Sequence, residues 1–235
     1  ILVANSHMMV MLPLTTKGAK YKPAEDFAPV VRLTSFFEAL SVPSGVPATS
    51  IAQWLDLARK NAQAGNFGVP AAGSVSHFLG YRLGQDNKVD LQAIPYKGAA
   101  PLVQDLLGGQ IQAGILPILD VAPHHQAGKL RVLAVNGTKR AQLLPTVPTL
   151  KELGHNIVAM SPYGLAGPAG MPADVVQVLH QAFRAAMQDP AFIAELARYD
   201  QELAYLPPEE YGRALRAAYE QERVVVERLG LAQKG

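Results

Sequence analysis

The chain has 235 residues, of which 49% are hydrophobic, and this is enough for one large or two small packed domains. Its formal net charge is +2 and its 21 Lys and Arg residues are scattered, which argues against a nucleic-acid partner. The absence of cysteine excludes disulfide frameworks, thiolate metal sites and cysteine nucleophiles. No apolar run reaches the length of a membrane span.

The first half of the chain alternates between apolar runs typical of strands and amphipathic stretches typical of helices. Ser50 and Gln53 have the spacing of a capping box, so a helix is predicted to begin there and to end at Gly65. The strands predicted in this half are 1–4, 30–42, 66–70 and 91–95, and the further helices are one opening at Gly73-Ser74-Val75-Ser76 and one spanning 99–107.

The second half continues the same alternation. Thr149 and Glu152 predict the cap of a short helix. Strands that alternate with helices indicate an α/β fold with mostly parallel sheets. The strands predicted here are 111–116, 130–135 and 157–166, and the helices are 173–187, 190–198 and 208–229.

Two groups of residues could suggest chemistry, but the sequence favours a structural role for both. His124 and His125 are adjacent, so one metal ion would rarely take both side chains, and the usual ligand spacings are missing. Ser74, Ser76 and His77 lack an evident acid to orient a base, and helix capping explains the serines better than catalysis. We therefore expect no catalytic residue, no metal and no cofactor.

The helix start at Gly73-Ser74-Val75-Ser76 is a candidate anion site. The first N–H groups of a helix have no partner within it, and the helix dipole places partial positive charge there. An ordinary capped helix explains the segment equally well. Lys97 follows a predicted strand and could bind an anion, although a solvated turn is the favoured interpretation. Asn5 and Ser6 also follow a strand and could donate to a ligand or form a turn.

The order of these motifs resembles the Bug-type receptors of tripartite tricarboxylate transporters. No single motif is specific, but eight of them occur in order between Asn66 and Gly170. They are Asn66-Phe67-Gly68, Gly73-Ser74 with His77, Pro95-Tyr96-Lys97-Gly98, Asp105 to Gln110, Pro123-His124 leading into Ala127 to Val135, Lys139-Arg140, Leu144 to Thr149, and Gly164-Leu165 with Gly167 to Gly170.

The resemblance implies an α/β protein with the type II periplasmic-binding-protein fold, in which two α/β domains joined by crossing strands close on a small carboxylate. The receptor would work in the periplasm, would catalyse nothing, and would deliver its ligand to membrane permease subunits. The resemblance places Asn5 and Ser6 on a ligand loop of the first domain and Tyr163 at the cleft border. It places Gly73, Ser74 and Ser76 at the anion-binding helix start of the second domain.

Three departures from the family pattern suggest a more apolar cleft. Leu116-Pro117 stands where the family has an Asp, Val69 to Ala72 replaces a polar turn, and Pro162 reduces an aromatic pair near Tyr163. A ligand with an apolar body and one carboxylate is therefore favoured over aspartate or citrate. The family's first strand and its glycine-rich loop have no counterpart here. The first domain is thus expected to be incomplete, either because the natural protein is longer or because a truncated chain pairs with a second copy.

Residues 1–32 and 155–235 are expected to form the first domain, and residues 33–154 the second. Two alternatives to a transport receptor remain open at this stage. One is a ligand-sensing component that signals to a membrane sensor through the same cleft. The other is an enzyme on the same fold, which would need an acid, a base or a nucleophile that the motifs do not reveal.

Overall fold

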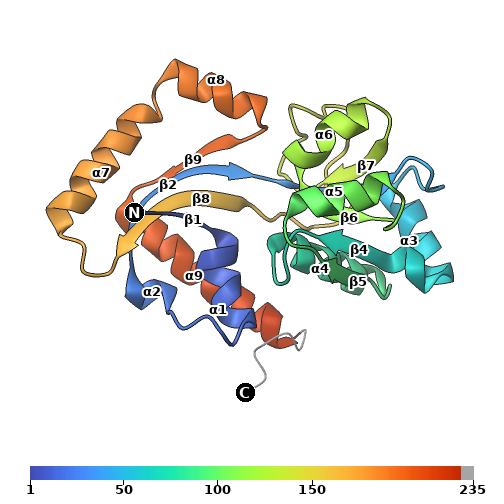
Figure 1. The fold of residues 1–235 in the computed structure, drawn as a ribbon, viewed down its shortest axis with the longest axis horizontal. Helices are drawn as coiled ribbons and strands as arrows, with labels where there is room; N and C mark the ends of the chain where they lie inside the picture. Colours follow the sequence, from blue (N-terminus) through green and yellow to red (C-terminus); the bar gives the residue numbers. More distant parts are fainter. Residues whose placement is uncertain (229–235) are drawn as a thin grey trace. The chain divides into compact units, whose positions relative to one another are not determined.

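The computed structural model describes residues 1–228, and the chain divides into two compact units. Unit 1 combines Ile1–Ser35 with the chain from Ser161 onward, and unit 2 is Phe36–Met160. Within residues 1–228, no helix has the length and apolar character needed to cross a membrane. Each unit has its own sheet with helices on both faces, and Figure 1 shows the elements of each.

Unit 2 is built on a five-stranded sheet. Its strands are β3 (Glu38–Pro43), β4 (Asn66–Val69), β5 (Gln92–Pro95), β6 (Gly114–Pro117) and β7 (Leu130–Val135). Its helices are α3 (Ile51–Lys60), the short 3₁₀-helix η2 (Ala62–Gly65), α4 (Val75–Asn87), α5 (Ala99–Leu107) and α6 (Ile118–Gln126). The strand order is β5-β4-β6-β3-β7, with β4 parallel to β5 and β6, and β3 antiparallel to β6 and β7.

Alternation along the strands gives this sheet two buried faces. Leu40 of β3 and Ile115 of β6 pack with α3 and α4, whereas their neighbours Ala39 and Leu116 pack with α5 and α6. Successive side chains of a strand point to opposite faces, so both faces need apolar residues. Trp54 of α3 is fully buried in the first of these two cores, and its indole N–H donates to the Ala64 carbonyl at 3.0 Å.

Unit 1 contains a four-stranded sheet in the order β1-β8-β2-β9. Its strands are β1 (Leu2–Asn5), β2 (Phe27–Phe36, whose last residue begins unit 2), β8 (Ser161–Pro168) and β9 (Glu202–Leu206). Its helices are the π-helix η1 (His7–Met11), α1 (Leu12–Thr15), α2 (Pro23–Asp26), α7 (Ala173–Ala186), α8 (Pro190–Arg198) and α9 (Pro208–Arg228). Strand β1 pairs antiparallel with β8, and β2 pairs antiparallel with β9.

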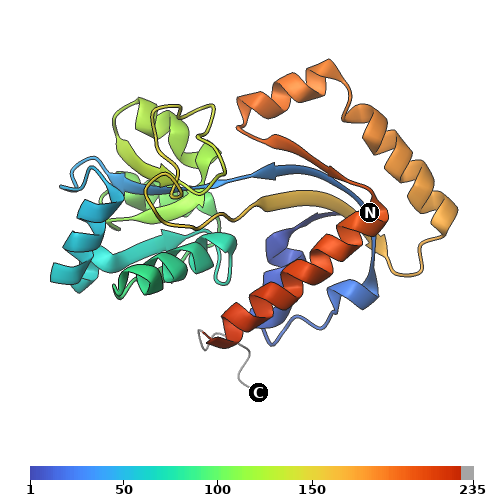
Figure 2. The ribbon, with the colours of Figure 1, turned by 180° about the vertical axis from the view of Figure 1, so that it is seen from behind.

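The two faces of this sheet carry different helices. Leu165 of β8 packs with side chains of α7 and α8, whereas the preceding residue, Gly164, faces Tyr211 of α9. A Cβ atom at Gly164 would lie 2.5 Å from the Tyr211 hydroxyl oxygen, so only glycine allows the buried ring to pack this closely. Helix α9 contacts η1, α1 and α2, and Figure 2 shows it alongside the N-terminal segment.

Several predictions about local structure were wrong. The sheets are not mostly parallel: the sheet of unit 2 is mixed, and in unit 1 both β1 and β9 pair antiparallel with a neighbour. Thr149 and Glu152 do form both capping bonds, at 3.0 and 2.7 Å, but a turn follows instead of a helix and ends at Gly154, whose φ is +88°. The strand predicted from residue 157 begins only at Ser161, and the one predicted from residue 111 begins at Gly114.

Candidate functional site

The turn between β4 and α4 has the features of an anion site. Gly73 adopts the left-handed conformation, with a φ of +66°, in which a residue with a side chain would be strained. Ser74 is the N-cap of α4, and its hydroxyl oxygen accepts a hydrogen bond from the His77 amide at 3.3 Å. This bond uses the oxygen of Ser74 as an acceptor and leaves its hydroxyl proton able to donate to a ligand.

His77 fixes the shape of this turn. Its Nδ1 atom accepts a hydrogen bond from the Gly73 amide at 2.8 Å, and its ring stacks on Tyr81 with the centroids 4.9 Å apart. Burial lowers the pKa of His77, which favours the neutral ring that this acceptor role requires. The sequence suggested His77 as a base and as part of a family motif but not as the acceptor for the Gly73 amide, although the four-residue spacing is compatible with this contact. His77 is therefore a positioning residue in the structure.

The first two amides of α4 have no hydrogen-bond partner among residues 1–228. Val75 and Ser76 are its first two residues, and their N–H groups donate no hydrogen bond within the described part of the chain. Such amides carry the partial positive charge of the helix start. Ser76 itself is buried, with 1% of its surface exposed. The arrangement offers two amides and the Ser74 hydroxyl to a carboxylate or a similar anion.

Unit 1 brings three of the other predicted residues together. Asn5, the last residue of β1, lies directly opposite Tyr163 of β8 in the antiparallel register, so both side chains project from the same face of the sheet. The side-chain oxygen of Asn5 accepts from the Met8 amide at 3.0 Å, which leaves its NH₂ group without a hydrogen bond among residues 1–228. Ser6 precedes η1 and makes no side-chain cap bond. Asn5 and Ser6 can therefore both donate to a ligand.

Other residues considered from the sequence lie in structural settings. Lys97 is exposed in the turn before α5, as expected for a solvated lysine. His125 accepts from the Val132 amide at 3.2 Å through Nδ1, and the described residues contain no cluster of three or more potential metal ligands. Leu116 is fully buried in the α5 and α6 core, so this departure from the family pattern affects packing and not a ligand surface.

Comparison with known proteins identifies relatives of this chain. The chain is 35% identical over 221 residues to a protein of Cupriavidus necator called "UPF0065 protein in gbd 5'region", covering 94% of this chain and 67% of that protein. A solved structure titled "R. palustris Rpa4515 with adipate" is 28% identical, with a TM-score of 0.90 over 98% of this chain and 77% of that one. "Structure of periplasmic binding protein BugD" is 25% identical, with a TM-score of 0.89 over 99% and 79%.

The two α/β units and these structural relatives define the class as a periplasmic binding protein of type II fold. Residues 1–231 match the Tripartite tricarboxylate transporter family receptor, and the chain belongs to this family of receptors rather than to a family of enzymes. It spans only between 51% and 56% of the length of four further curated relatives. These relatives give no support to the alternative in which a truncated chain pairs with a second copy.

Proposed function

We propose that this chain captures a small organic carboxylate in the periplasm and delivers it to the membrane permease subunits of a tripartite tricarboxylate transporter. The observation that carries this proposal is the β4–α4 turn, where Gly73 and His77 hold the Ser74 hydroxyl and two free amides at the start of α4. A carboxylate with its negative charge is the natural partner of such a group of donors.

The residues proposed to bind the ligand form two sets. One set lies in unit 1, among the polar side chains that follow and pair with β1, and the other lies in unit 2, at the turn before α4. The solved relative that carries adipate in its title supports an organic carboxylate as the ligand class. The proposed ligand-binding residues are Asn5, Ser6, Tyr163, Gly73, Ser74 and Ser76.

The ligand is proposed to have an apolar body and a single carboxylate. Val69 to Ala72 and Pro162 supply few hydrogen-bond donors near the proposed residues. A sugar would need aromatic surfaces for stacking, but aromatic residues make up only 7% of the chain. The single tryptophan, Trp54, is fully buried and hydrogen-bonded in the core of unit 2.

A thermal-shift screen tests the ligand class. The panel should contain linear and branched monocarboxylates, dicarboxylates such as adipate, the neutral amide of each acid, and common monosaccharides. We expect acids to raise the melting temperature and their amides and the sugars to leave it unchanged, because ligands that bind only the folded state stabilise it. Stabilisation by sugars without stabilisation by acids would refute the proposal.

Transport and sensing are separated by the partner that the receptor engages. Immobilised receptor, loaded with the best acid of the screen, should retain permease subunits from solubilised membranes of the source bacterium. Recovery of a membrane sensor in their place, dependent on the same acid, would show that the chain is a ligand-sensing component. The binding chemistry would be the same in both cases.

A further inference from the structure

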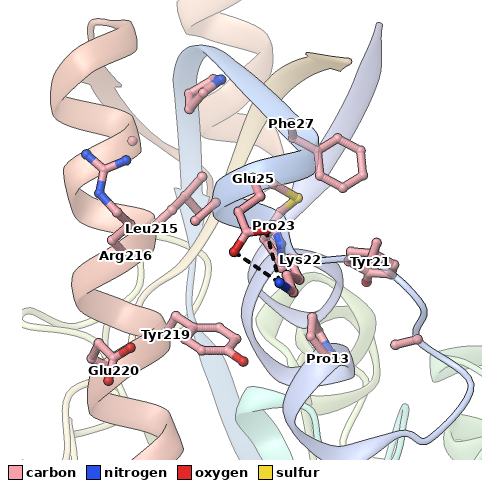
Figure 3. A pocket seen from close by; sticks show the side chains of 15 residues that line it. Pro13, Tyr21, Lys22, Pro23, Glu25, Phe27, Leu215, Arg216, Tyr219 and Glu220 are labelled. Atoms are coloured by element: carbon pink, nitrogen blue, oxygen red, sulfur yellow. Dashed lines mark hydrogen bonds and ion pairs between the residues drawn. The ribbon is translucent and has the colours of Figure 1, made fainter. Parts of the chain in front are cut away.

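Unit 1 contains a cavity that the proposed function does not use. It has a volume of about 580 Å³ and lies between α9 and the segment that runs from η1 to the start of β2 (Figure 3). This volume is within the range of small-molecule sites, roughly 300–1,000 Å³. Asn5 and Tyr163 share a sheet face with Leu165, on the side of α7 and α8, whereas α9 packs on the opposite face. The cavity is therefore separate from that set of residues.

Part of the cavity wall is apolar and held in place by local contacts. Met9, which is 1% exposed, and Leu215 contribute aliphatic surface, and Figure 3 shows Leu215 pointing from α9 toward the α2 segment. The Tyr21 hydroxyl donates to the Met8 carbonyl at 2.5 Å, and the Tyr21 ring meets Phe27 edge to face at 5.7 Å. An aromatic wall held by a hydrogen bond and a ring contact gives a preformed surface for an apolar ligand body.

Most of the charged residues that line the cavity form ion pairs within residues 1–228, but one does not. Lys22 pairs with Glu25 at 3.1 Å, as the dashed lines in Figure 3 mark, and Glu220 pairs with Arg223 at 3.1 Å. Arg216 has no ion pair and no hydrogen bond within the described part of the chain. The cavity therefore has one uncompensated positive charge beside its apolar surface.

A second polar group on the same helix also lines the cavity. Tyr219, one helical turn from Arg216 on α9, also lines the cavity, and its hydroxyl has no partner among residues 1–228. The Arg216 guanidinium lies over Gly212, because a Cβ atom at Gly212 would be 3.6 Å from its Nη1 atom. In Figure 3 the Arg216 guanidinium and the Tyr219 ring extend in opposite directions along α9, so the guanidinium alone can pair with a carboxylate while the apolar wall holds the rest of the molecule.

We infer that this cavity is a second binding site, for a small organic acid with a compact apolar body and one carboxylate. The charge favours an anion over a neutral or cationic analogue of the same shape. The inference uses no residue of the proposed transport site, so each of the two can fail without the other.

The test is a titration of the 235-residue chain labelled with ¹³C at its methionine methyl groups, of which there are six. Three probes share one ring: cyclohexanecarboxylate, cyclohexanecarboxamide and cyclohexylmethylammonium. Met9→Leu identifies the reporter signal inside the cavity. We expect the carboxylate to shift this signal saturably, and the amide and the ammonium to bind at least about tenfold more weakly.

Two arginine variants on α9 complete the design. Arg216→Gln should weaken cyclohexanecarboxylate about tenfold or more, through loss of a charge-assisted hydrogen bond. Arg213→Gln is the matched control, because Arg213 is exposed like Arg216 but pairs with Glu209 at 4.0 Å and does not line the cavity, so it should leave the affinity unchanged. The inference is overturned if no probe moves the Met9 signal, if amide and carboxylate bind equally, or if the two variants behave alike.

Discussion

Substitutions of Ser74 should separate an effect on folding from an effect on ligand binding. Its hydroxyl oxygen caps α4 by accepting from the His77 amide, and its proton is free for a ligand. Two substitutions divide these roles. Ser74→Ala removes both the cap and the donor, whereas Ser74→Asp keeps a capping oxygen and places a negative charge where the carboxylate is proposed to bind.

The effects on stability follow from the cap alone. Replacing a capping serine with alanine costs about 1 kcal/mol of folding free energy, which corresponds to roughly 2–4 °C in melting temperature for a chain of this size. Aspartate is as effective a capping residue as serine, and its charge also interacts favourably with the helix dipole. Without ligand, we therefore expect Ser74→Asp to melt at or above the wild-type temperature and Ser74→Ala to melt below it.

The effects on binding follow a different order. Loss of one hydroxyl donor to a carboxylate costs about 1.5–3 kcal/mol, or roughly one to two powers of ten in Kd. In Ser74→Asp, a ligand carboxylate at about 4 Å from the new charge is repelled by about 4 kcal/mol at an effective dielectric of about 20. That repulsion corresponds to nearly a thousandfold in Kd. Affinity should thus fall from wild type to alanine to aspartate.

The assay combines calorimetry of unfolding without ligand with isothermal titration of the best acid from the screen. The order of the variants by stability should differ from their order by affinity, because Ser74→Asp should be stable but unable to bind the acid. If both variants bind the acid like the wild type, Ser74 does not contact the carboxylate. If aspartate also unfolds early, the capping bond does not have the role assigned to it.

Two further predictions concern packing and pH. Gly164→Ala would place a Cβ atom 2.5 Å from the Tyr211 hydroxyl oxygen and should lower the free energy of unfolding in urea by about 1–3 kcal/mol. Gly45→Ala is the control, because a Cβ atom there would have no heavy atom within 4 Å. Equal losses of stability in the two variants would contradict the packing argument. Burial lowers the pKa of His77, so the unfolded chain takes up a proton near pH 6.5 before the folded one does. The free energy of unfolding should therefore decrease as the pH is lowered below about 6.5. The decrease should be less steep in His77→Asn, whose amide oxygen can replace the acceptor for the Gly73 amide. Identical pH slopes in the two proteins would argue against this role of His77.

The sequence predicted the elements whose ends are marked by local chemistry. The helix at 99–107 ends at a pair of glycines and was placed without error, and Ser50 does cap α3 by accepting from the Gln53 amide. The short strand β9 was missed, and so were η1 and α2, which are only five and four residues long. Elements of this length depend on the tertiary structure that covers them, so their sequences carry little periodic signal.

Strand direction and side-chain partners were the other features that could not be predicted. Apolar alternation gives the same pattern whether a neighbour runs parallel or antiparallel, so the antiparallel pairing of β3 left no trace in the sequence. For the proposed site, the segment at Gly73 was identified from its position before a helix. The bond from its amide to His77 depends on a ring orientation that only the folded chain fixes.

The cavity beside α9 illustrates the same limit. Its walls come from two segments separated by about 180 residues, around Tyr21 and around Tyr219, and neither segment matches a binding motif. The uncompensated charge of Arg216 is visible only once the neighbouring pairs are known, because the sequence around it contains both acids and bases.

Isothermal titration of one organic acid against its own amide tests the carboxylate-receptor account most directly. The two ligands differ in one group, because the NH₂ donor of the amide replaces a charged acceptor oxygen of the acid. The wild-type chain should be compared with Ser74→Asp. The account predicts saturable binding of the acid to the wild type, at least about tenfold weaker binding of the amide, and loss of acid binding in Ser74→Asp. Equal affinities for acid and amide, or undiminished binding of the acid by Ser74→Asp, would contradict it.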